Sequence, residues 1–385
     1  MVSTRTDAAV QHWLALGRVE GLGIRSAQKL VEHFESPAAV YGASLTALEG
    51  CGLAAPVAQR LHKGEGLAEA EGEMAAAEKL GCHLVAFVAP DYPPLLKHIA
   101  DPPLVLYVRG DSALLAQHAV AIVGTRRPTA YGSSVAHRLA ADLARRQIVI
   151  VSGLARGIDS ASHRGALEAG GKTVAVLGCG VDVIYPRENK RLTEQIMETG
   201  AVISEFPLGT SPQPENFPVR NRIISGLALG AVVVEAAEYS GSLITARLAS
   251  EQDREVYAVP GNITSAQSFG PNLLIKQGAK LVDNWMDVVE EFPAAIRQEL
   301  MPSQEGLGRG EATAYPALFA PAPTPGLTEE QRVVYDSLRV DQVLFIDSIF
   351  GQVPLPQAQI LSALLELEMN GLVRQLPGKN FIRKL

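Results

Sequence analysis

Residues Ala119 to Gly132 read AVAIVGTRRPTAYG, and this stretch decides the fold. The apolar run Ala119–Val123 is short and ends at Gly124, which is typical of a strand buried on both faces of a parallel sheet. Hydroxyl and guanidinium groups fill the loop that follows, and a helical pattern begins near Ser133. Because ligands of open α/β sheets bind outside the carboxyl ends of the strands, this loop is a candidate binding site.

The same pattern of strand and loop recurs four times further along the chain. The additional candidate strands lie within Val149–Gly157, Thr173–Gly180, Ala201–Glu205 and Ala231–Glu235. Helical patterns accompany them at 133–146, 160–169, 190–199, 221–229, 242–252 and 272–277, and Asp159 is the expected N-cap of the second helix. Alternating strands and helices predict βαβ units, so we expect an α/β protein with a Rossmann-like, mostly parallel sheet. Five strand ends would then meet at one rim.

The chain of 385 residues is longer than one hydrophobic core usually organises, so several domains are expected. We predict an N-terminal helical module at 1–82, the Rossmann-like core at 83–292, a linker at 293–325 and a winged-helix domain at 326–385. The linker shows no sustained periodicity, which is typical of an extended and mobile connection.

Both terminal modules admit more than one role. Glycine turns at 21–23 and 50–52 each precede an amphipathic helix, a pattern of small SAM or helix-hairpin-helix-like domains. These glycines either cap helices in a packing module or present backbone N–H groups to a phosphate. The third helix of the predicted winged helix, 356–370, has no Lys or Arg and contains Glu366 and Glu368. It would repel a duplex groove, so we expect it to dock onto a protein or to serve a structural role.

Composition excludes several classes of protein. No apolar run approaches the length of about 20 residues that a membrane helix needs, and the first residues lack a signal-peptide hydrophobic region, so a cytoplasmic protein is expected. The three cysteines are far apart and form no C-x-x-C pair, which argues against disulfides and a zinc site. The net charge is −7, but residues 120–230 hold 13 Lys and Arg against 9 Asp and Glu, a local field that attracts an anionic partner.

Common nucleotide-binding motifs are missing. A dinucleotide site requires G-x-G-x-x-G after the first strand, where this chain has GTRRPTAYG. The pair Gly178 and Gly180 follows a later strand without the third glycine, and no P-loop sequence occurs. We therefore expect neither a nicotinamide nor a flavin cofactor, nor any other cofactor or metal.

The predicted rim instead presents groups that bind anions, and several phosphates in a row would satisfy them better than one. The candidate ligand-binding residues are Gly124, Thr125, Arg126, Arg127, Ser152, Gly153, Arg156, Lys172, Arg187, Lys190, Arg220, Asn221, Arg222, Ser240, Gly241 and Ser242. The alternative is that some of the arginines form internal ion pairs with acidic residues such as Asp159, Asp182, Glu205 or Glu235.

Two further side chains have competing interpretations. Phe217 stands between prolines and near two arginines, so it is either an exposed ring on which a base of single-stranded nucleic acid stacks or a core residue. His163 lies beside Arg164, but spacing assigns no nucleophile or carboxylate to complete a catalytic triad. We interpret His163 as structural or as a neighbour of a phosphate.

Six runs within residues 100–292 resemble the DprA (Smf) family of DNA-processing proteins: GTRRPTAYG, VSGLARGIDSASHRGAL, KTVAVLGCGVDVIYPRENKRL, ISEFPLGTSPQPENFPVRNRIISGL, VVVEAAEYSGSLITARLASEQDREVYAVPGN and FGPNLLIKQGA. The resemblance implies single-stranded DNA binding and dimerisation through the Rossmann-like domain, and loading of the recombinase RecA during natural transformation. By motif it implies phosphate-binding roles for Arg126, Lys172 and Arg222, and base stacking for Phe217. Residues 212–216 lack a basic residue, so we expect weaker DNA contact at that edge.

These observations predict a DNA-binding protein without catalytic turnover, with single-stranded DNA across the carboxyl ends of the sheet. The resemblance further implies that it protects incoming single strands. One alternative is a nucleotide-processing enzyme that cleaves N-glycosidic bonds. Relatives of that kind resemble one another in a G-G-x-G-T-x-x-E motif, and this chain has YSGSLITARLASE there, without the glutamate at that spacing. The other alternative, a scaffold that binds only proteins, leaves the basic rim unexplained.

Overall fold

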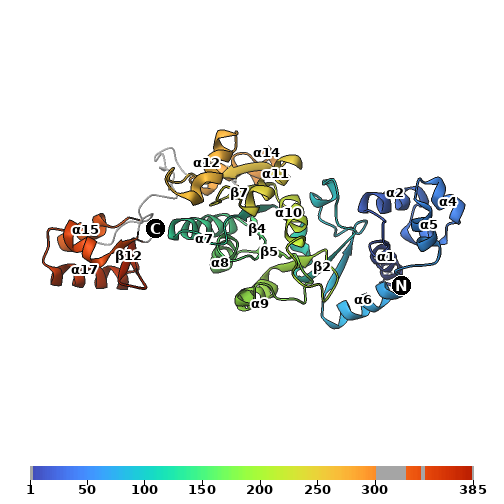
Figure 1. Cartoon of the computed structure of the whole chain (residues 1–385), viewed down its shortest axis with the longest axis horizontal. Helices are drawn as coiled ribbons and strands as arrows, with labels where there is room; N and C mark the ends of the chain where they lie inside the picture. Colours follow the sequence, from blue (N-terminus) through green and yellow to red (C-terminus); the bar gives the residue numbers. More distant parts are fainter. Residues whose placement is uncertain (1–2, 301–326, 340–342, 384–385) are drawn as a thin grey trace.

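The computed structural model describes residues 3–300, 327–339 and 343–383, and its centre is a nine-stranded sheet (Figure 1). The strands are β1 (His83–Ala86), β2 (Val105–Gly110), β3 (Ala119–Val123), β4 (Val149–Ser152), β5 (Thr173–Val176), β6 (Ala201–Ser204), β7 (Gly230–Val233), β8 (Glu255–Ala258) and β9 (Lys280–Leu281). Their order across the sheet is β1-β2-β6-β5-β4-β3-β7-β8-β9. The strand predicted at Ala119–Val123 is confirmed to the residue.

Strands β3 to β9 are mutually parallel, whereas β2 runs antiparallel to both of its neighbours, β6 and the edge strand β1. From β3 the chain builds outward through β4, β5 and β6, and it then returns to the other side of β3 to build β7, β8 and β9. The order therefore reverses between β3 and β7, where Ile122 pairs with Val232. Ligands of such sheets bind at the carboxyl ends beside this reversal point.

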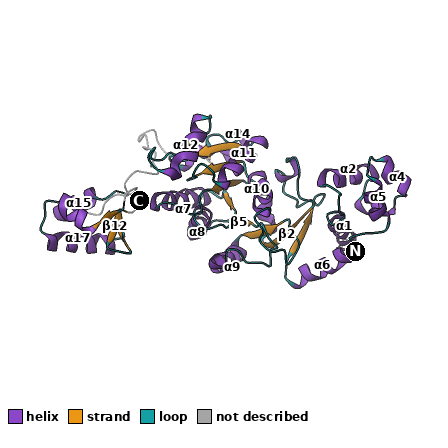
Figure 2. Ribbon diagram, viewed as in Figure 1, coloured by secondary structure: helices purple, strands orange, loops and turns teal. Residues whose placement is uncertain are grey.

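Helices cover both faces of the sheet (Figure 2). They are α7 (Ala130–Ala144), α8 (Ile158–Glu168), α9 (Lys190–Thr199), α10 (Asn216–Gly226), α11 (Gly241–Glu251), α12 (Phe269–Lys276), α13 (Trp285–Val289) and α14 (Ala294–Leu300). Side chains of α7, α8 and α13 pack on one face with Val120 and Ile122 of β3. Side chains of α10 and α11 pack on the other face with Ala121 and Val123. Every residue of β3 is buried, as a strand covered on both faces requires.

Six helices form the N-terminal module: α1 (Ser3–Leu16), α2 (Ile24–Phe34), α3 (Pro37–Gly42), α4 (Leu45–Gly50), α5 (Ala55–His62) and α6 (Leu67–Lys79). The module shares a core with the first strands of the sheet, because Trp13 packs in one cluster with Val105 and Tyr107 of β2. The helical module predicted at 1–82 is thus attached to the β1–β2 edge, far from the reversal point in the strand order.

The C-terminal region consists of α15 (Glu329–Ser337), β10 (Leu344–Phe345), α16 (Ile346–Gln352), α17 (Gln357–Met369), β11 (Val373–Leu376) and β12 (Asn380–Arg383). Three helices and a three-stranded sheet confirm the predicted winged helix. The start of the predicted linker differs from expectation, because 294–300 form α14. Its remainder from 301 lies outside the described residues.

Helices α7, α8, α10, α11 and α12 begin one to five residues before their predicted starts, and two of these differences have a clear local cause. Helix α10 begins at Asn216 rather than at Asn221, because Pro218 occupies the first turn, where its missing N–H costs nothing. Helix α8 begins at Ile158 after Gly157, whose φ of 79° few other residues adopt easily. The N-cap predicted at Asp159 is therefore wrong, since Asp159 lies inside the first turn.

Within the described parts of the chain, no helix combines the length and the apolar character that crossing a membrane requires.

Candidate nucleic-acid interface

The loop after β3 is held in place by Glu235, which follows β7. The backbone N–H of Thr125 donates to the Glu235 carbonyl at 2.7 Å. The N–H of Thr129 donates to the Glu235 carboxylate at 2.9 Å, and its hydroxyl donates to the other carboxylate oxygen. Burial raises the pKa of Glu235. With this loop anchored across the β3–β7 boundary, Arg126 and Arg127 are left exposed to solvent.

Arg220 of α10 lies beneath the loop after β4. Its guanidinium donates to the carbonyl of Gly153 at 2.7 Å and also to the carbonyl of Val176 at the end of β5. A Cβ atom at Gly153 would lie 2.2 Å from the guanidinium, so only glycine fits there. Arg220 is 4% exposed, and burial lowers its pKa to about 10. Its Nε has no hydrogen-bond partner within 3–300, 327–339 and 343–383.

Asp159 completes this buried polar layer. Its carboxylate accepts hydrogen bonds from the N–H groups of Gly153 at 3.1 Å and Ala155 at 3.3 Å. Burial raises the pKa of Asp159, and the nearby Arg220 opposes that rise. Ser152 is also buried and donates to the carbonyl of Ile122 at 2.6 Å. Ser152 therefore joins β4 to β3 and does not face solvent.

Arg222 belongs to an internal ion-pair cluster on α10. Its Nε lies 3.0 Å from a carboxylate oxygen of Asp101, and its Nη2 pairs with Glu205. The Arg222 side chain is 6% exposed, and burial raises the pKa of Glu205. Arg222 therefore follows the ion-pair alternative. The expectation that its side chain faces a ligand on the rim is wrong, because its guanidinium is paired with Asp101 and Glu205.

Lys172 also departs from its expected position. It is exposed and directly precedes β5, so it lies at the amino ends of the parallel strands. Its carbonyl accepts a hydrogen bond from Ile150 N–H near the start of β4. The prediction that Lys172 shares a rim with Arg126 is wrong, because Arg126 follows its strand and Lys172 comes before one.

Two adjoining cavities open at the carboxyl ends of the sheet. The larger has a volume of about 510 Å³ and lies at the reversal point, between the loop after β3 and the start of α11. The smaller has a volume of about 250 Å³ and lies over the ends of β4 and β5. The residues that line both cavities are Arg126, Ala155, Tyr185, Phe217 and Arg220.

An aromatic pair stands at the boundary of the two cavities. The ring centres of Tyr185 and Phe217 are 5.6 Å apart, with 34° between the ring planes. The guanidinium carbon of Arg126 lies 5.4 Å from the centre of the Phe217 ring. Phe217 is half-buried, so it is neither the exposed ring nor the core residue of the two sequence interpretations. Tyr185 is 38% exposed. Sequence reasoning missed Tyr185, for which the only signal was an aromatic residue preceding a proline and several cations.

Further cations surround the smaller cavity. Arg127 and Arg156 line it, and Arg156 donates to the Glu188 carboxylate at 2.6 Å. Arg187 and Lys190 are exposed on the segment that follows Pro186, itself a lining residue, but they do not line the cavity. These two cations would reach only a ligand that extends beyond the cavity.

The first turn of α11 forms one wall of the larger cavity. Ser240, Gly241 and Ser242 line it, and the two serine hydroxyls lie 2.8 Å apart. The Asn221 amide donates to the carbonyl of Gly241 at 3.5 Å, which links α10 to α11. Among the residues that the structure describes, no side chain caps α11, so its first N–H groups are available to an anion.

The cavities therefore unite most of the residues that the sequence indicated. Those that line a cavity are Gly124, Arg126, Arg127, Gly153, Arg156, Phe217, Arg220, Asn221, Ser240, Gly241 and Ser242. Those that do not are Thr125, Ser152, Lys172, Arg187, Lys190 and Arg222. In the described part of the chain, no group of three His, Cys, Asp or Glu side chains could hold a metal ion.

His163 lies in the interior and away from the cavities. Its Nδ1 is 2.6 Å from the Thr173 hydroxyl, which in turn donates to the carbonyl of Ile150 at 2.6 Å. Because that hydroxyl proton is engaged, Nδ1 is the protonated nitrogen of the ring. Burial, with Arg220 and Arg164 adding to it, lowers the pKa of His163 to about 3. The structural interpretation of His163 fits this environment.

Comparisons with known proteins show which family this chain resembles in sequence and structure. Residues 83–293 match the family model described as DNA recombination-mediator protein A, and residues 319–379 match that of the DprA winged helix domain. The DNA processing protein DprA of Bacillus subtilis is 47% identical over 57% of this chain and 74% of its own length. Protein Smf of Escherichia coli is 38% identical over 80% of this chain and 79% of its own.

A solved structure agrees with these matches. The X-ray structure of DNA processing protein A from Streptococcus pneumoniae superposes with a TM-score of 0.66 at 36% identity, and the match covers 74% of this chain and 98% of that one. The sheet domain and the winged helix each match a model of this family, and the chain belongs to the DprA/Smf family of DNA-processing proteins.

Proposed function

We propose that this protein binds single-stranded DNA across the carboxyl ends of its sheet, without turnover, and hands the strand to the recombinase RecA. The observation that supports this most is the aromatic pair Tyr185 and Phe217 at the boundary of two cavities lined by Arg126, Arg127 and Arg156. Proteins that hold single strands combine cations along the path of the backbone with aromatic rings on which the bases stack. Membership in a family of recombination mediators supports the recombinase as partner.

The geometry favours a single strand over a duplex. Phe217 is half-buried between cavities of about 510 and 250 Å³, so only a base that is free of its pairing partner can reach the ring. Paired bases are stacked inside the helix and expose only their edges. A duplex would therefore contact the exposed arginines through its phosphates but leave the aromatic pair unused.

Carboxylates near the cavities already have structural tasks, which supports a binding role rather than hydrolysis. Glu235 holds the loop after β3, and Asp159 accepts two backbone hydrogen bonds beside Arg220. Asp159 nevertheless lines the larger cavity with a raised pKa, which is the feature that would favour an N-glycosidic hydrolase. Release of free base from nucleotides or oligonucleotides by the purified protein would decide for that alternative.

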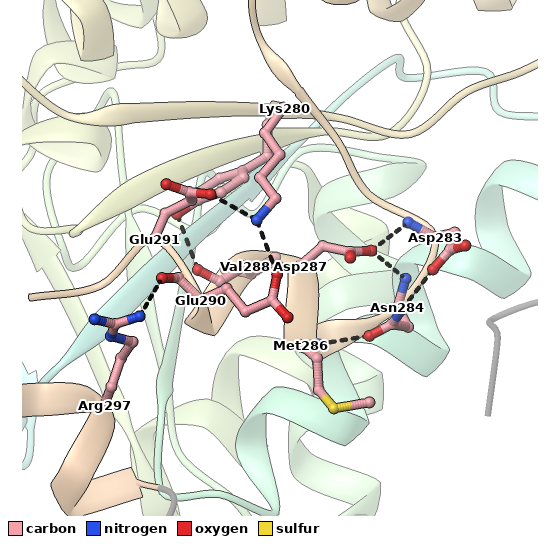
Figure 3. A network of polar contacts seen from close by, with 10 residues as sticks. Lys280, Asp283, Asn284, Met286, Asp287, Val288, Glu290, Glu291 and Arg297 are labelled. Carbon is pink, nitrogen blue, oxygen red and sulfur yellow. Dashed lines mark hydrogen bonds and ion pairs between the residues drawn. The ribbon is translucent and has the colours of Figure 1, made fainter. Parts of the chain in front are cut away.

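We further propose a homodimer that forms through the Rossmann-like domain at its β9 edge. Phe269 and Leu273 of α12 and Leu281 of β9 are exposed apolar side chains at this edge. Lys280 would normally protect an edge strand, but its ammonium is paired with Glu290 at 3.1 Å and Glu291 at 2.6 Å (Figure 3). The backbone edge and three apolar groups are thus left for a second copy. Light scattering should give twice the chain mass for the wild type and one chain mass for Leu281→Arg.

The binding proposal is tested by titrating labelled oligothymidylate with the full chain and measuring fluorescence anisotropy. We expect saturable binding that weakens as salt rises, with an unlabelled duplex competing poorly, and with no free base released. A pull-down of RecA on the coated strand, with and without the protein, tests the partner. Failure of the wild type to bind oligothymidylate would overturn the proposal. We further propose that the protein meets single-stranded DNA in the cytoplasm.

A further inference from the structure

Tyr239 is the most exposed aromatic side chain near the cavities, with 92% of its surface open to solvent. It lies in the loop that joins β7 to α11. A large ring gains free energy when it is removed from water, so an exposed ring beside a ligand cavity is a surface on which a flat ligand can stack. None of the residues that the structure describes covers the Tyr239 ring, and its face is open to such a ligand.

The position of Tyr239 relates it to the larger cavity. The next three residues, Ser240 to Ser242, form one wall of that cavity, and Phe217 lines it as well. Strand β7 is the neighbour of β3 at the reversal point, so the loop of Tyr239 adjoins the loop of Arg126. A strand that leaves the cavity past the start of α11 must pass beside Tyr239.

We propose that Tyr239 is a second base-stacking platform, on which a base of the bound single strand rests after the backbone has passed the first turn of α11. This inference depends on the proposed function and extends its site beyond the cavities. The α11 N–H groups and the Ser240 and Ser242 hydroxyls would contact the phosphate that links the two platforms.

Charge around the ring supports a base rather than a phosphate at Tyr239. Its neighbour Glu238 is exposed and would repel a phosphate placed beside the ring. The cations Arg126 and Arg127 lie on the opposite side of the reversal point, where the backbone is expected. A strand whose phosphates contact these cations near β3 would present a base to Tyr239 on the β7 side, and stacking tolerates any base because each has a π-face.

Ile263 provides a matched control. It is also 92% exposed, and it follows β8, the next strand along the same rim. The two loops are joined, because Ala236 N–H donates to the carbonyl of Gln267 at 2.7 Å and Gly270 N–H donates to that of Ala236 at 2.8 Å. An apolar surface for a protein would use both side chains, whereas base stacking requires only the aromatic one.

The experiment uses the full chain and oligothymidylates that carry one 5-iodouracil at successive positions. After irradiation, mass spectrometry of the digested adduct should locate a crosslink on Tyr239 for one position of the iodouracil. Tyr239→Ala should then weaken binding of the unmodified strand by about 5- to 150-fold, while Tyr239→Phe and Ile263→Ala stay within about twofold of the wild type. With an abasic residue at the crosslinking position, Tyr239→Ala should bind as tightly as the wild type.

The outcomes separate this inference from the function on which it depends. If the wild type binds and Phe217→Ala weakens binding, but Tyr239 yields no crosslink and Tyr239→Ala binds normally, the second platform is wrong and the proposed function stands. Equal losses in Tyr239→Ala and Ile263→Ala that persist on the abasic strand would also overturn stacking. If the wild type binds no oligothymidylate, the proposed function fails and the second platform fails with it.

Discussion

The guanidinium carbon of Arg126 lies 5.4 Å from the centre of the Phe217 ring, which joins the loop after β3 to the first turn of α10. A cation so placed is attracted to the ring face, an interaction of about 0.5–1 kcal/mol at an exposed site. The proposed phosphate-binding group, Arg126, and the proposed base-binding group, Phe217, are therefore in contact with each other. Their contributions to DNA affinity should not be additive, because replacing either side chain changes the surroundings of the other.

Replacement of Arg126 tests the electrostatic part of the interface. In Arg126→Ala the slope of log K against log salt should become shallower by about 0.7, the number of counterions that a single strand releases per phosphate contact. The slope is measured by anisotropy titrations with labelled oligothymidylate over a series of salt concentrations. Lys172→Ala is the matched control, because it removes the same charge at the amino ends of the strands. Identical slopes for the wild type and both variants would exclude Arg126 as a phosphate ligand.

Replacement of Phe217 tests base stacking. Phe217→Ala should weaken binding of oligothymidylate by about 1–3 kcal/mol and leave the salt slope nearly unchanged, because a ring and not a charge is lost. The variant Phe217→Leu keeps most of the apolar volume beside Gly178, so it should fold well but bind as weakly as the alanine variant. Melting temperatures measure the fold separately. A leucine variant that binds like the wild type would show that the ring only fills space.

Replacement of Arg222 should affect stability rather than DNA binding. Arg222→Ala leaves the Glu205 carboxylate, whose side chain is only 13% exposed, without its partner, and breaking a buried pair costs about 3–5 kcal/mol. Urea unfolding measures this loss, and Arg222→Ala combined with Glu205→Gln should recover part of it, because no unpaired charge then remains buried. The folded fraction of Arg222→Ala should bind oligothymidylate as the wild type does. Normal stability with weakened binding would instead restore the phosphate-binding role.

His163 makes the stability of the fold depend on pH. Its pKa is about 3 in the folded chain, against about 6.5 in an unfolded one, so between these values only the unfolded chain holds the proton. The stabilising contribution is complete above pH 6.5 and is lost as the pH falls, by up to about 1.4 kcal/mol per pH unit. Urea unfolding between pH 7 and 5 should show a steeper loss for the wild type than for His163→Gln, and equal losses would contradict the assignment.

Local sequence patterns were sufficient for the parallel sheet. The strand Ala119–Val123 and helix Lys190–Thr199 have the predicted bounds, because an apolar run between glycine-rich loops and an amphipathic period are properties of neighbouring residues. The same patterns placed Arg126 and the start of α11 at strand ends. The cavity at the reversal point follows from strand order, and βαβ connections leave few orders to choose from.

The sequence by itself therefore determined the parallel α/β core with its central strands and most of its helices, the helical and winged-helix parts on either side of it, and the four arginines that line the cavities. Only the tertiary structure decided that Arg222 pairs with Glu205, that Lys172 lies at the opposite edge of the sheet from Arg126, and that Tyr185 meets Phe217. The physical reason is that burial and pairing are set by residues far apart in the chain. The sequence around an arginine does not show whether its charge is neutralised by a carboxylate 17 positions away, as in Arg222, or by the phosphate of a ligand.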